Sequence, residues 1–333
     1  MRSALCGKRS EQLQVVWMES LKEKMMHTAL LLLTQKKVDV VLGFQRGTIP
    51  MMSQPILISH PEKVDQLHWD SFCSINLANY LPQRKDRIAI FAKGCDSRNI
   101  VLQIQENQIK REQLHIIGVP CQGMLDRRKV QAELNGRLLL GVRETSEHFH
   151  LLGEGFMDTL ERSGYLQDNC AICSHRNAVI DDEVLAEPVL EQEGVERYED
   201  VKAIEAMTAH QRWSYFEKLL APCIRCYACR NACPMCYCPV CFVDESTPQW
   251  LGKSIDPTDT MTFHFLRAYH LAGRCTDCGN CEQVCPMSIK MRQLTKKLEK
   301  DIIELYDYEA GLSLNQRPPL DTYRPDDPQD FIR

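Results

Sequence analysis

The sequence lacks a hydrophobic run long enough to cross a bilayer. A membrane-spanning helix needs about 20 mostly apolar residues, and no unbroken apolar run here is longer than residues 29–33. The basic first ten residues lead into Glu11 and Gln12 rather than into the apolar segment of an export signal. We therefore expect a cytoplasmic protein with no membrane span.

The sequence also has no excess of positive charge, and it lacks one familiar glycine motif. The chain has 40 Lys and Arg against 45 Asp and Glu, which leaves a net charge of -5 at pH 7. Nucleic-acid binding needs a basic surface, so this balance argues against a nucleic-acid partner. No G-x-G-x-x-G sequence occurs, which excludes an ordinary dinucleotide-binding Rossmann turn.

Cysteine, in contrast, is abundant, with 17 in 333 residues. In a reducing compartment dense thiols favour metal binding over a disulfide scaffold. Eight of them form two runs with the same spacing, C-x2-C-x2-C-x3-C-P. This is the bacterial-ferredoxin run, in which three cysteines bind one 4Fe-4S cube and the fourth binds the other cube. The runs are Cys223, Cys226, Cys229 and Cys233, and then Cys275, Cys278, Cys281 and Cys285.

We therefore expect two cubanes whose fourth ligands are exchanged between the runs. A zinc site would use two cysteine pairs and would leave the remaining cysteines and the following proline without a role. Because such cubes carry single electrons, the sequence predicts a redox protein, with a zinc-binding interaction protein as the weakest alternative. One set is Cys223, Cys226, Cys229 and Cys285, and the other is Cys275, Cys278, Cys281 and Cys233.

The sequence pattern of residues 38–180 predicts an α/β domain. Short apolar, β-branched stretches alternate with helical patterns, which implies crossover connections and a mostly parallel sheet. After them we expect a tight hairpin turn at Asn135-Gly136 and a helix near 155–163. Strands are expected at 38–42, 87–92 and 114–119, and helices at 71–81 and 96–105.

Four further cysteines are candidates for a third cluster. Cys95 and Cys121 follow two of the predicted strands, and ligands in open α/β sheets bind beyond the carboxyl ends of the strands. Cys170 and Cys173 add a C-x2-C pair. Four thiolates is the number that one more cubane needs, so the set predicts a third cluster, with packing or another metal as the alternative.

The remaining cysteines have no clear assignment. Cys236, Cys238 and Cys241 follow the first run so closely that packing alone does not explain them, but no fourth ligand is evident from the spacing. Cys6 and Cys73 are isolated, and an isolated cysteine is most often a small buried hydrophobe.

The fold class predicted is α/β plus α, a mixed and mostly parallel α/β domain followed by a mainly helical two-cluster ferredoxin domain. Helical periodicity at 201–220, 259–272 and 288–306 places the cysteine runs among helices. The strongly acidic residues 181–200 suggest a linker, and prolines keep the tail from being a helix. The expected domains are an N-terminal helix (1–37, with helical spacing from 11), the α/β domain (38–180), the linker (181–200), the ferredoxin domain (201–310) and the tail (311–333).

Several short segments, in the same order, resemble the β subunit of coenzyme-F420-reducing hydrogenases and formate dehydrogenases. The likeness covers roughly residues 38–290, and Cys170 and Cys173 stand where that family has a cysteine pair. Residues 268–275 also resemble iron-sulfur subunits of heterodisulfide-reductase-type complexes. The segments are 40–44 (VVLGF), 76–81 (NLANYL), 92–98 (AKGCDSR), 116–123 (IIGVPCQG) and 223–230 (CIRCYACR).

The resemblance implies an FAD on the α/β domain, iron-sulfur clusters that connect it to catalytic and electron-transfer subunits of an anaerobic complex, and exchange of hydride with coenzyme F420. A flavin accepts two electrons and can pass them singly to cubanes. A flavin-free electron relay that serves as a docking subunit is the alternative. Cationic or amide groups suit phosphate or ring carbonyls, and the candidates for the flavin pocket are Gly43, Gly47, Asn76, Lys93 and Arg98.

The sequence departs from the family motif at two places. The usual Lys-Pro-Cys after the second strand is Lys93-Gly94-Cys95 here. After Cys173 the family's proline-rich stretch is replaced by residues 174–177 (SHRN).

Overall fold

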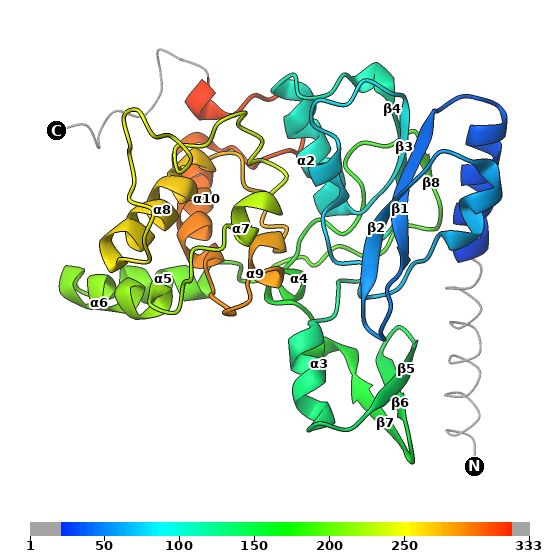
Figure 1. The fold of residues 1–333 in the computed structure, drawn as a ribbon, viewed down its shortest axis with the longest axis horizontal. Helices are drawn as coiled ribbons and strands as arrows, with labels where there is room; N and C mark the ends of the chain where they lie inside the picture. Colours follow the sequence, from blue (N-terminus) through cyan, green and yellow to red (C-terminus); the bar gives the residue numbers. More distant parts are fainter. Residues whose placement is uncertain (1–20, 322–333) are drawn as a thin grey trace. The chain divides into compact units, whose positions relative to one another are not determined.

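The computed structural model describes residues 21–321. The chain forms two compact units (Figure 1). The described part of unit 1 is residues 21–77, 83–97 and 109–193, and that of unit 2 is residues 78–82, 98–108 and 194–321.

Unit 1 contains a five-stranded sheet in the order β2-β1-β3-β4-β8 (Figure 1). The strands β1, β3, β4 and β8 are parallel, and β2 pairs antiparallel with β1. Every residue of β3 is buried, as expected for a central strand covered on both faces. The mostly parallel sheet is therefore confirmed. The strands are β1 (Val40–Arg46), β2 (Ser53–Ile58), β3 (Ile88–Ala92), β4 (Leu114–Gly118) and β8 (Glu183–Val184).

The prediction of a helix at residues 71–81 is wrong. This segment consists of turns and a short 3-10 helix, Leu77–Tyr80. The amide of Phe72 donates to the Asp70 carboxylate at 2.9 Å, and the amide of Leu77 donates to Asp96 at 2.8 Å. Side chains that capture backbone amides in this way compete with helical hydrogen bonds. The helix expected after β3 is confirmed as α2 (Gly94–Gln105).

A second, antiparallel sheet in unit 1 overturns two predictions. Strand β7 (Phe156–Glu161) replaces the helix expected near 155–163, and its exposure alternates with the period of two that a strand requires. Asn135-Gly136 ends the helix α3 (Arg127–Leu134) instead of forming a hairpin, because Asn135 is left-handed (φ 46) and such a residue also caps a helix. The other two strands of this sheet are β5 (Leu139–Glu144) and β6 (His148–Gly153).

Unit 2 is mainly helical. The predicted helix over 201–220 is interrupted at Thr208, whose side chain caps the second of two helices with Gln211. The helices predicted at 259–272 and 288–306 are confirmed as α8 and α10, which contact each other. The helices are α5 (Glu199–Glu205), α6 (Ala209–Leu220), α7 (Ala228–Asn231), α8 (Pro257–His270), α9 (Asn280–Gln283) and α10 (Arg292–Tyr306).

The segments near the two ends of the chain are described only in part. Residues 21–34 are helical, and the first half of the predicted N-terminal helix lies outside the described residues. The tail is described to residue 321 and contains a short 3-10 helix, Pro319–Asp321. Gln105 donates to the carbonyls of Ser313 and Gln316 at 2.9 and 2.8 Å, which holds the first part of the tail on unit 2.

The acidic residues 181–200, expected as a linker, also contain regular structure. They include β8 and the start of α5, and Asp182 accepts a hydrogen bond from the amide of Ile116 at 2.7 Å. Within residues 21–321, no helix has both the length and the apolar composition needed to cross a membrane.

Candidate iron-sulfur and cofactor sites

The two cysteine runs fold into the same local structure. The third cysteine of each run lies in a four-residue helix, α7 or α9. Two residues after the first cysteine, Arg225 (φ 50) and Asp277 (φ 53) are left-handed, and so are Tyr227 (φ 58) and Gly279 (φ 78) before the helices. The amide of Arg225 donates to the Cys223 sulfur at 3.4 Å. Left-handed turns of this kind point amides at sulfur, which is one way in which proteins stabilise cluster thiolates.

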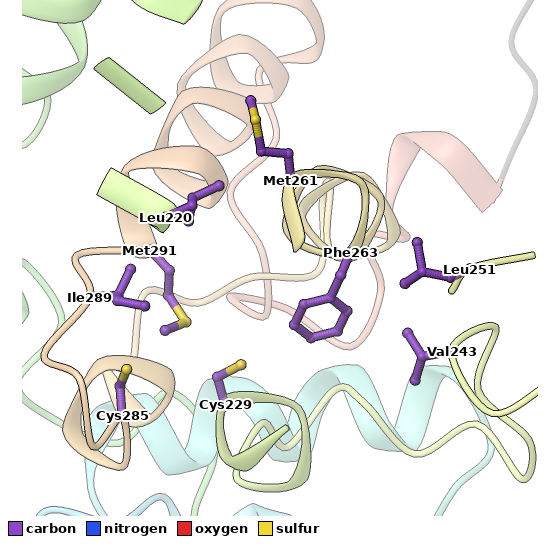
Figure 2. Packing of buried hydrophobic residues seen from close by; sticks show 9 residues of the cluster. All are labelled: Leu220, Cys229, Val243, Leu251, Met261, Phe263, Cys285, Ile289 and Met291. Atoms are coloured by element: carbon purple, nitrogen blue, oxygen red, sulfur yellow. The ribbon is translucent and has the colours of Figure 1, made fainter. Parts of the chain in front are cut away.

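Cysteines from different runs meet in the first set. Cys229 of α7 and Cys285 belong to one buried apolar cluster (Figure 2), and the partly buried Cys223 packs against it. The Cys229 thiol also interacts electrostatically with Cys226, and burial raises the pKa of Cys229 to about 11. The structure therefore brings together the four sulfurs that the sequence analysis assigned to this set.

The second set is assembled in the same crossed manner. The Cys281 thiol interacts electrostatically with Cys233 and Cys275, and Cys275 does so with Cys278. Burial raises the pKa of both Cys275 and Cys281. Such thiols lose their protons readily only when a metal compensates the charge, so the donor set suits a metal centre.

Metal centres differ in how their sulfurs must be arranged. No three His, Cys, Asp or Glu side chains among residues 21–321 converge on the position of one bare metal ion. In a cubane each cysteine binds a different iron atom.

Helix α8 adds two polar side chains that sequence reasoning missed. His264 Nε2 lies 3.3 Å from the Cys223 sulfur, and burial lowers the pKa of His264 to about 4, which keeps the ring neutral. Three residues later, Arg267 Nη2 donates to the Cys229 carbonyl at 3.1 Å. Nothing in the spacing of the cysteines points to these two residues, because the helix lies in the gap between the runs.

The unassigned Cys236 lies beside a predicted ligand. A hydrogen bond from Cys236 lowers the pKa of Cys233, although burial opposes the charge. Cys238 is exposed, and Cys241 packs against the apolar cluster that holds Cys229.

The candidates for a third cluster lie around two glycines of unit 1. The amide of Gly123 donates to the Cys121 sulfur at 3.4 Å, and a Cβ added at Gly123 would lie 3.3 Å from Cys170 Cβ. Cys170 is on α4 (Asp168–Ala171), and Gln192 donates to the carbonyls of Cys170 and Cys173 at 3.3 and 3.0 Å. These contacts tie the C-x2-C pair to the segment after β4.

The two departures from the family motif contact each other. A Cβ added at Gly94 would lie 2.2 Å from the His175 carbonyl oxygen and 2.8 Å from that of Asn177. The amide of Cys121 donates to the carbonyl of Arg176, in the same segment, at 3.0 Å. No side chain fits at residue 94 in this arrangement, so the altered segment 174–177 can pack here only because residue 94 is a glycine.

The Lys93 ammonium has several partners inside unit 1. It pairs with Asp96 at 3.0 Å, donates to the carbonyls of Cys73 and Ile75 at 3.1 and 3.2 Å, and lies 4.9 Å from the centre of the Phe44 ring. Burial alone would lower the pKa of Lys93, but Asp96, Cys95 and Cys121 together outweigh it and the pKa is raised. Lys93 is therefore a buried permanent cation that also interacts electrostatically with Cys95 and Cys121.

The other flavin candidates occupy different environments. Arg98 donates to the carbonyl of Ala310 at 2.9 and 2.8 Å and is buried. Asn76 Nδ2 donates to the Cys95 carbonyl at 3.1 Å, and Gly43 lies against Leu67 and Phe91 in the core. The flavin-binding role of these residues stays a prediction.

Gly47, the fifth candidate, lines a cavity of about 540 Å³ in unit 1. That volume is within the range of small-ligand sites, about 300–1,000 Å³. The cavity lies where β1 ends, and His68 in its wall pairs with Asp70 at 2.8 Å. Its polar lining otherwise carries both signs of charge, with Lys22, Arg46, Arg143, Asp70 and Glu144.

Cysteines from two runs meet in the helical unit, and this arrangement is typical of ferredoxin-type iron-sulfur proteins. Residues 219–289 match the family described as a 4Fe-4S dicluster domain. The chain is 23% identical over 355 residues to the β subunit of F420-dependent formate dehydrogenase from Methanocaldococcus jannaschii, covering 87% of this chain and 91% of the relative. This chain is thus a relative of those β subunits, and the resemblance seen in the motifs is confirmed.

Two further proteins are similar. The β subunit of F420-dependent formate dehydrogenase 1 from Methanococcus maripaludis is 24% identical over 358 residues, covering 86% of this chain and 90% of the relative. Among solved structures, a chain of the F420-reducing NiFe hydrogenase complex from Methanosarcina barkeri matches with a TM-score of 0.37 at 15% identity, over 47% of this chain and 63% of that one.

Proposed function

We propose that this chain is the electron-transferring flavin and iron-sulfur β subunit of an anaerobic oxidoreductase complex. The observation that carries the proposal is the meeting of cysteines from two runs, within the segment that matches a 4Fe-4S dicluster domain. Each set supplies four thiolates, the number that one cubane requires. The ligands are Cys223, Cys226, Cys229 and Cys285 for one cluster and Cys275, Cys278, Cys281 and Cys233 for the other.

Bound cubanes would accept and release one electron at a time. The chain's own residues provide the surroundings. Apolar side chains such as Ile289, Met291 and Phe263 keep water from the first cysteine set. Amides at Arg225 and Asp277 hydrogen-bond the first sulfur of each run. Hydrogen bonds and solvent exclusion at sulfur are what set cluster potentials.

A third cubane on Cys95, Cys121, Cys170 and Cys173 is part of the proposal. Its support is the contact of Gly123 with both Cys121 and Cys170, and the buried cation of Lys93 near Cys95 and Cys121. A permanent cation in a low-dielectric interior favours the anionic state of these sulfurs. An electron entering unit 1 would then have an iron-sulfur acceptor there.

The flavin would bind in the cavity beside Gly47. The cavity wall offers groups that suit both the phosphates and the ring system of an FAD. They are the closely approaching backbone at Gly47, the cations Arg46 and Arg143, and the Trp69 ring. Relatives named as F420-dependent enzymes favour coenzyme F420 as the partner in hydride exchange. Formate dehydrogenase, hydrogenase and heterodisulfide-reductase-type subunits are the candidate partner proteins.

The decisive experiment is a flavin spectrum of the anaerobically purified full-length chain, with iron, sulfide and zinc counted on the same sample. We expect about twelve irons per chain, three cubes of four, and one flavin. Iron without flavin would leave the flavin-free relay as the function. Zinc in place of iron and sulfide would overturn the redox function entirely.

The partner is identified by purifying the intact complex. A molybdenum or tungsten subunit that co-purifies would identify formate as the donor, and a nickel subunit would identify hydrogen.

A further inference from the structure

We infer that Arg267 is a fixed cation shared by the two cubane sites, and that it raises the reduction potentials of both clusters. The inference rests on the proposed function in that it takes the two crossed cysteine sets as cluster ligands. It goes beyond that function by assigning the control of electron affinity to one residue on α8.

The first support is position. The Arg267 side chain is 5% exposed, and its Nη2 donates to the Cys229 carbonyl at 3.1 Å. The guanidinium also hydrogen-bonds the sulfurs of Cys233 and Cys236 and interacts electrostatically with Cys281. Cys229 belongs to one cysteine set, whereas Cys233 and Cys281 belong to the other. Arg267 therefore lies where the two sets meet.

The second support is the missing carboxylate. Among the described residues, Arg267 forms no ion pair with Asp or Glu, whereas the buried Arg292 pairs with Asp277 at 2.5 Å and Arg225 lies 3.7 Å from Asp259. A buried cation without a counter-charge is strongly unfavourable. A cube held by four thiolates is a net anion, so two clusters at these sites would supply the charge that no carboxylate provides.

The third support is a spare hydrogen-bond donor. Arg267 Nε is buried, and no acceptor for it exists within residues 21–321. Buried N–H groups almost always have a partner. The inorganic sulfides and thiolates of a cube are acceptors, and hydrogen bonds to cluster sulfurs are a known control of potential.

The physical consequence has a definite sign. Reduction adds one negative charge to a cluster, and a nearby fixed cation stabilises the reduced form more than the oxidised form. Water cannot screen the interaction, because the side chain is buried. Removing the cation must therefore make both clusters harder to reduce, whereas a residue that serves packing alone would leave the potentials unchanged.

The test is an EPR-monitored redox titration of the anaerobic full-length protein, with iron counted on every sample. We expect Arg267→Met to lower the ratio of reduced to oxidised cluster about tenfold at a fixed potential, a shift of about 59 mV for a one-electron couple. Arg267→Lys keeps the charge and should stay close to the wild type.

The matched control is Arg230→Gln. Arg230 is next to Cys229 in the chain, but its side chain is 20% exposed and already pairs with Asp244 at 2.7 Å. Its loss should leave the potentials unchanged.

Each outcome decides the matter. Full iron content with an unchanged potential in Arg267→Met overturns the inference. Arg267→Gln is the second neutral variant, and if both neutral variants lose iron while Arg267→Lys keeps it, the cation serves cluster assembly and the tuning role is overturned. Absence of iron from the wild type would instead contradict the proposed function, so the two failures are distinguishable.

Discussion

Cys285 of the second cysteine run shares a buried apolar cluster with Cys229 of the first (Figure 2). The two runs are separated by the whole of α8, yet their short helices α7 and α9 contact each other. In the proposed ligation, each run would therefore contribute to both metal sites. Two clusters bound in this way would lie close together, which suits rapid transfer of single electrons between them.

Crossed ligation predicts a specific pattern of iron loss. Cys223→Ala and Cys285→Ala should each remove about four irons per chain, and the double variant should lose no more than either single variant. Combining Cys223→Ala with Cys233→Ala should remove about eight. Iron analysis of anaerobic samples checks this. If the Cys223/Cys285 pair lost eight irons and the Cys223/Cys233 pair four, each run would hold its own cluster.

The third cysteine set predicts a loss of iron in unit 1. Cys121→Ala and Cys170→Ala should each lower the iron content by about four per chain and leave the ferredoxin-type EPR signals in place. Cys73→Ala is the control, because Cys73 is fully buried and its thiol donates to the His68 carbonyl and the Asp70 carboxylate. Unchanged iron in both variants would remove the third cluster from the proposal.

The cavity predicts a steric effect on flavin binding. A Cβ at Gly47 would lie 2.6 Å from the Met52 carbonyl oxygen, so Gly47→Val should deform the wall and weaken FAD binding at least about tenfold, or about 1.4 kcal/mol. FAD per chain, read from the absorbance spectrum, is the measurement. Gly164→Ala is the control, since an added Cβ there meets open space. Equal flavin in both variants would place the FAD elsewhere.

Arg162 supports the core of unit 1. Its Nη1 donates to the Ser71 hydroxyl at 2.6 Å and lies 3.2 Å from the buried Glu144 carboxylate, and its Nη2 donates to the Gly123 carbonyl. Arg162→Met should lower the free energy of unfolding by about 3–5 kcal/mol, because it leaves Glu144 buried without its partner. Denaturant unfolding under anaerobic conditions measures this.

A surface pair provides the comparison for Arg162. Arg87 pairs with Asp39 where both side chains are about half exposed, so Arg87→Met should change stability little. Equal losses of stability in the two variants would contradict the role assigned to Arg162.

Glu144 predicts a pH dependence. Burial raises the pKa of Glu144, although Arg162 opposes the shift. A raised pKa in the folded state favours the protonated carboxyl, so its contribution to stability is complete below the pKa of the unfolded chain, about 4.3, and is lost as the pH rises through the folded value. Thermal unfolding from pH 4 to 8 should therefore show a smaller decline in Glu144→Gln than in the wild type. The exposed Glu154→Gln should follow the wild type, and a steeper decline in Glu144→Gln would refute the assignment.

Local structure was predictable where one pattern dominated. The apolar runs at β3 and β4 and the helical spacing of α8 and α10 were predicted correctly, because the periodicity of buried residues is a local property of the chain. Residues 71–81 and 156–161 were not. In the first case the carboxylates of Asp70 and Asp96, which lie outside the segment, accept hydrogen bonds from backbone amides within it. In the second case the strand forms because it pairs with β6.

The spacing of the cysteines, by itself, determined the repeated loops and hence the class of metal site, since a fixed number of residues between thiols restricts which backbone turns can form. The motif also predicted the exchange of the fourth ligands, but only the tertiary structure decided where Arg267 lies between the two sets and where a cavity opens beside Gly47. The physical reason is the distance along the chain over which each kind of signal acts. Spacing and periodicity act over a few residues, whereas these arrangements depend on how helices and strands far apart in the chain bury their side chains together.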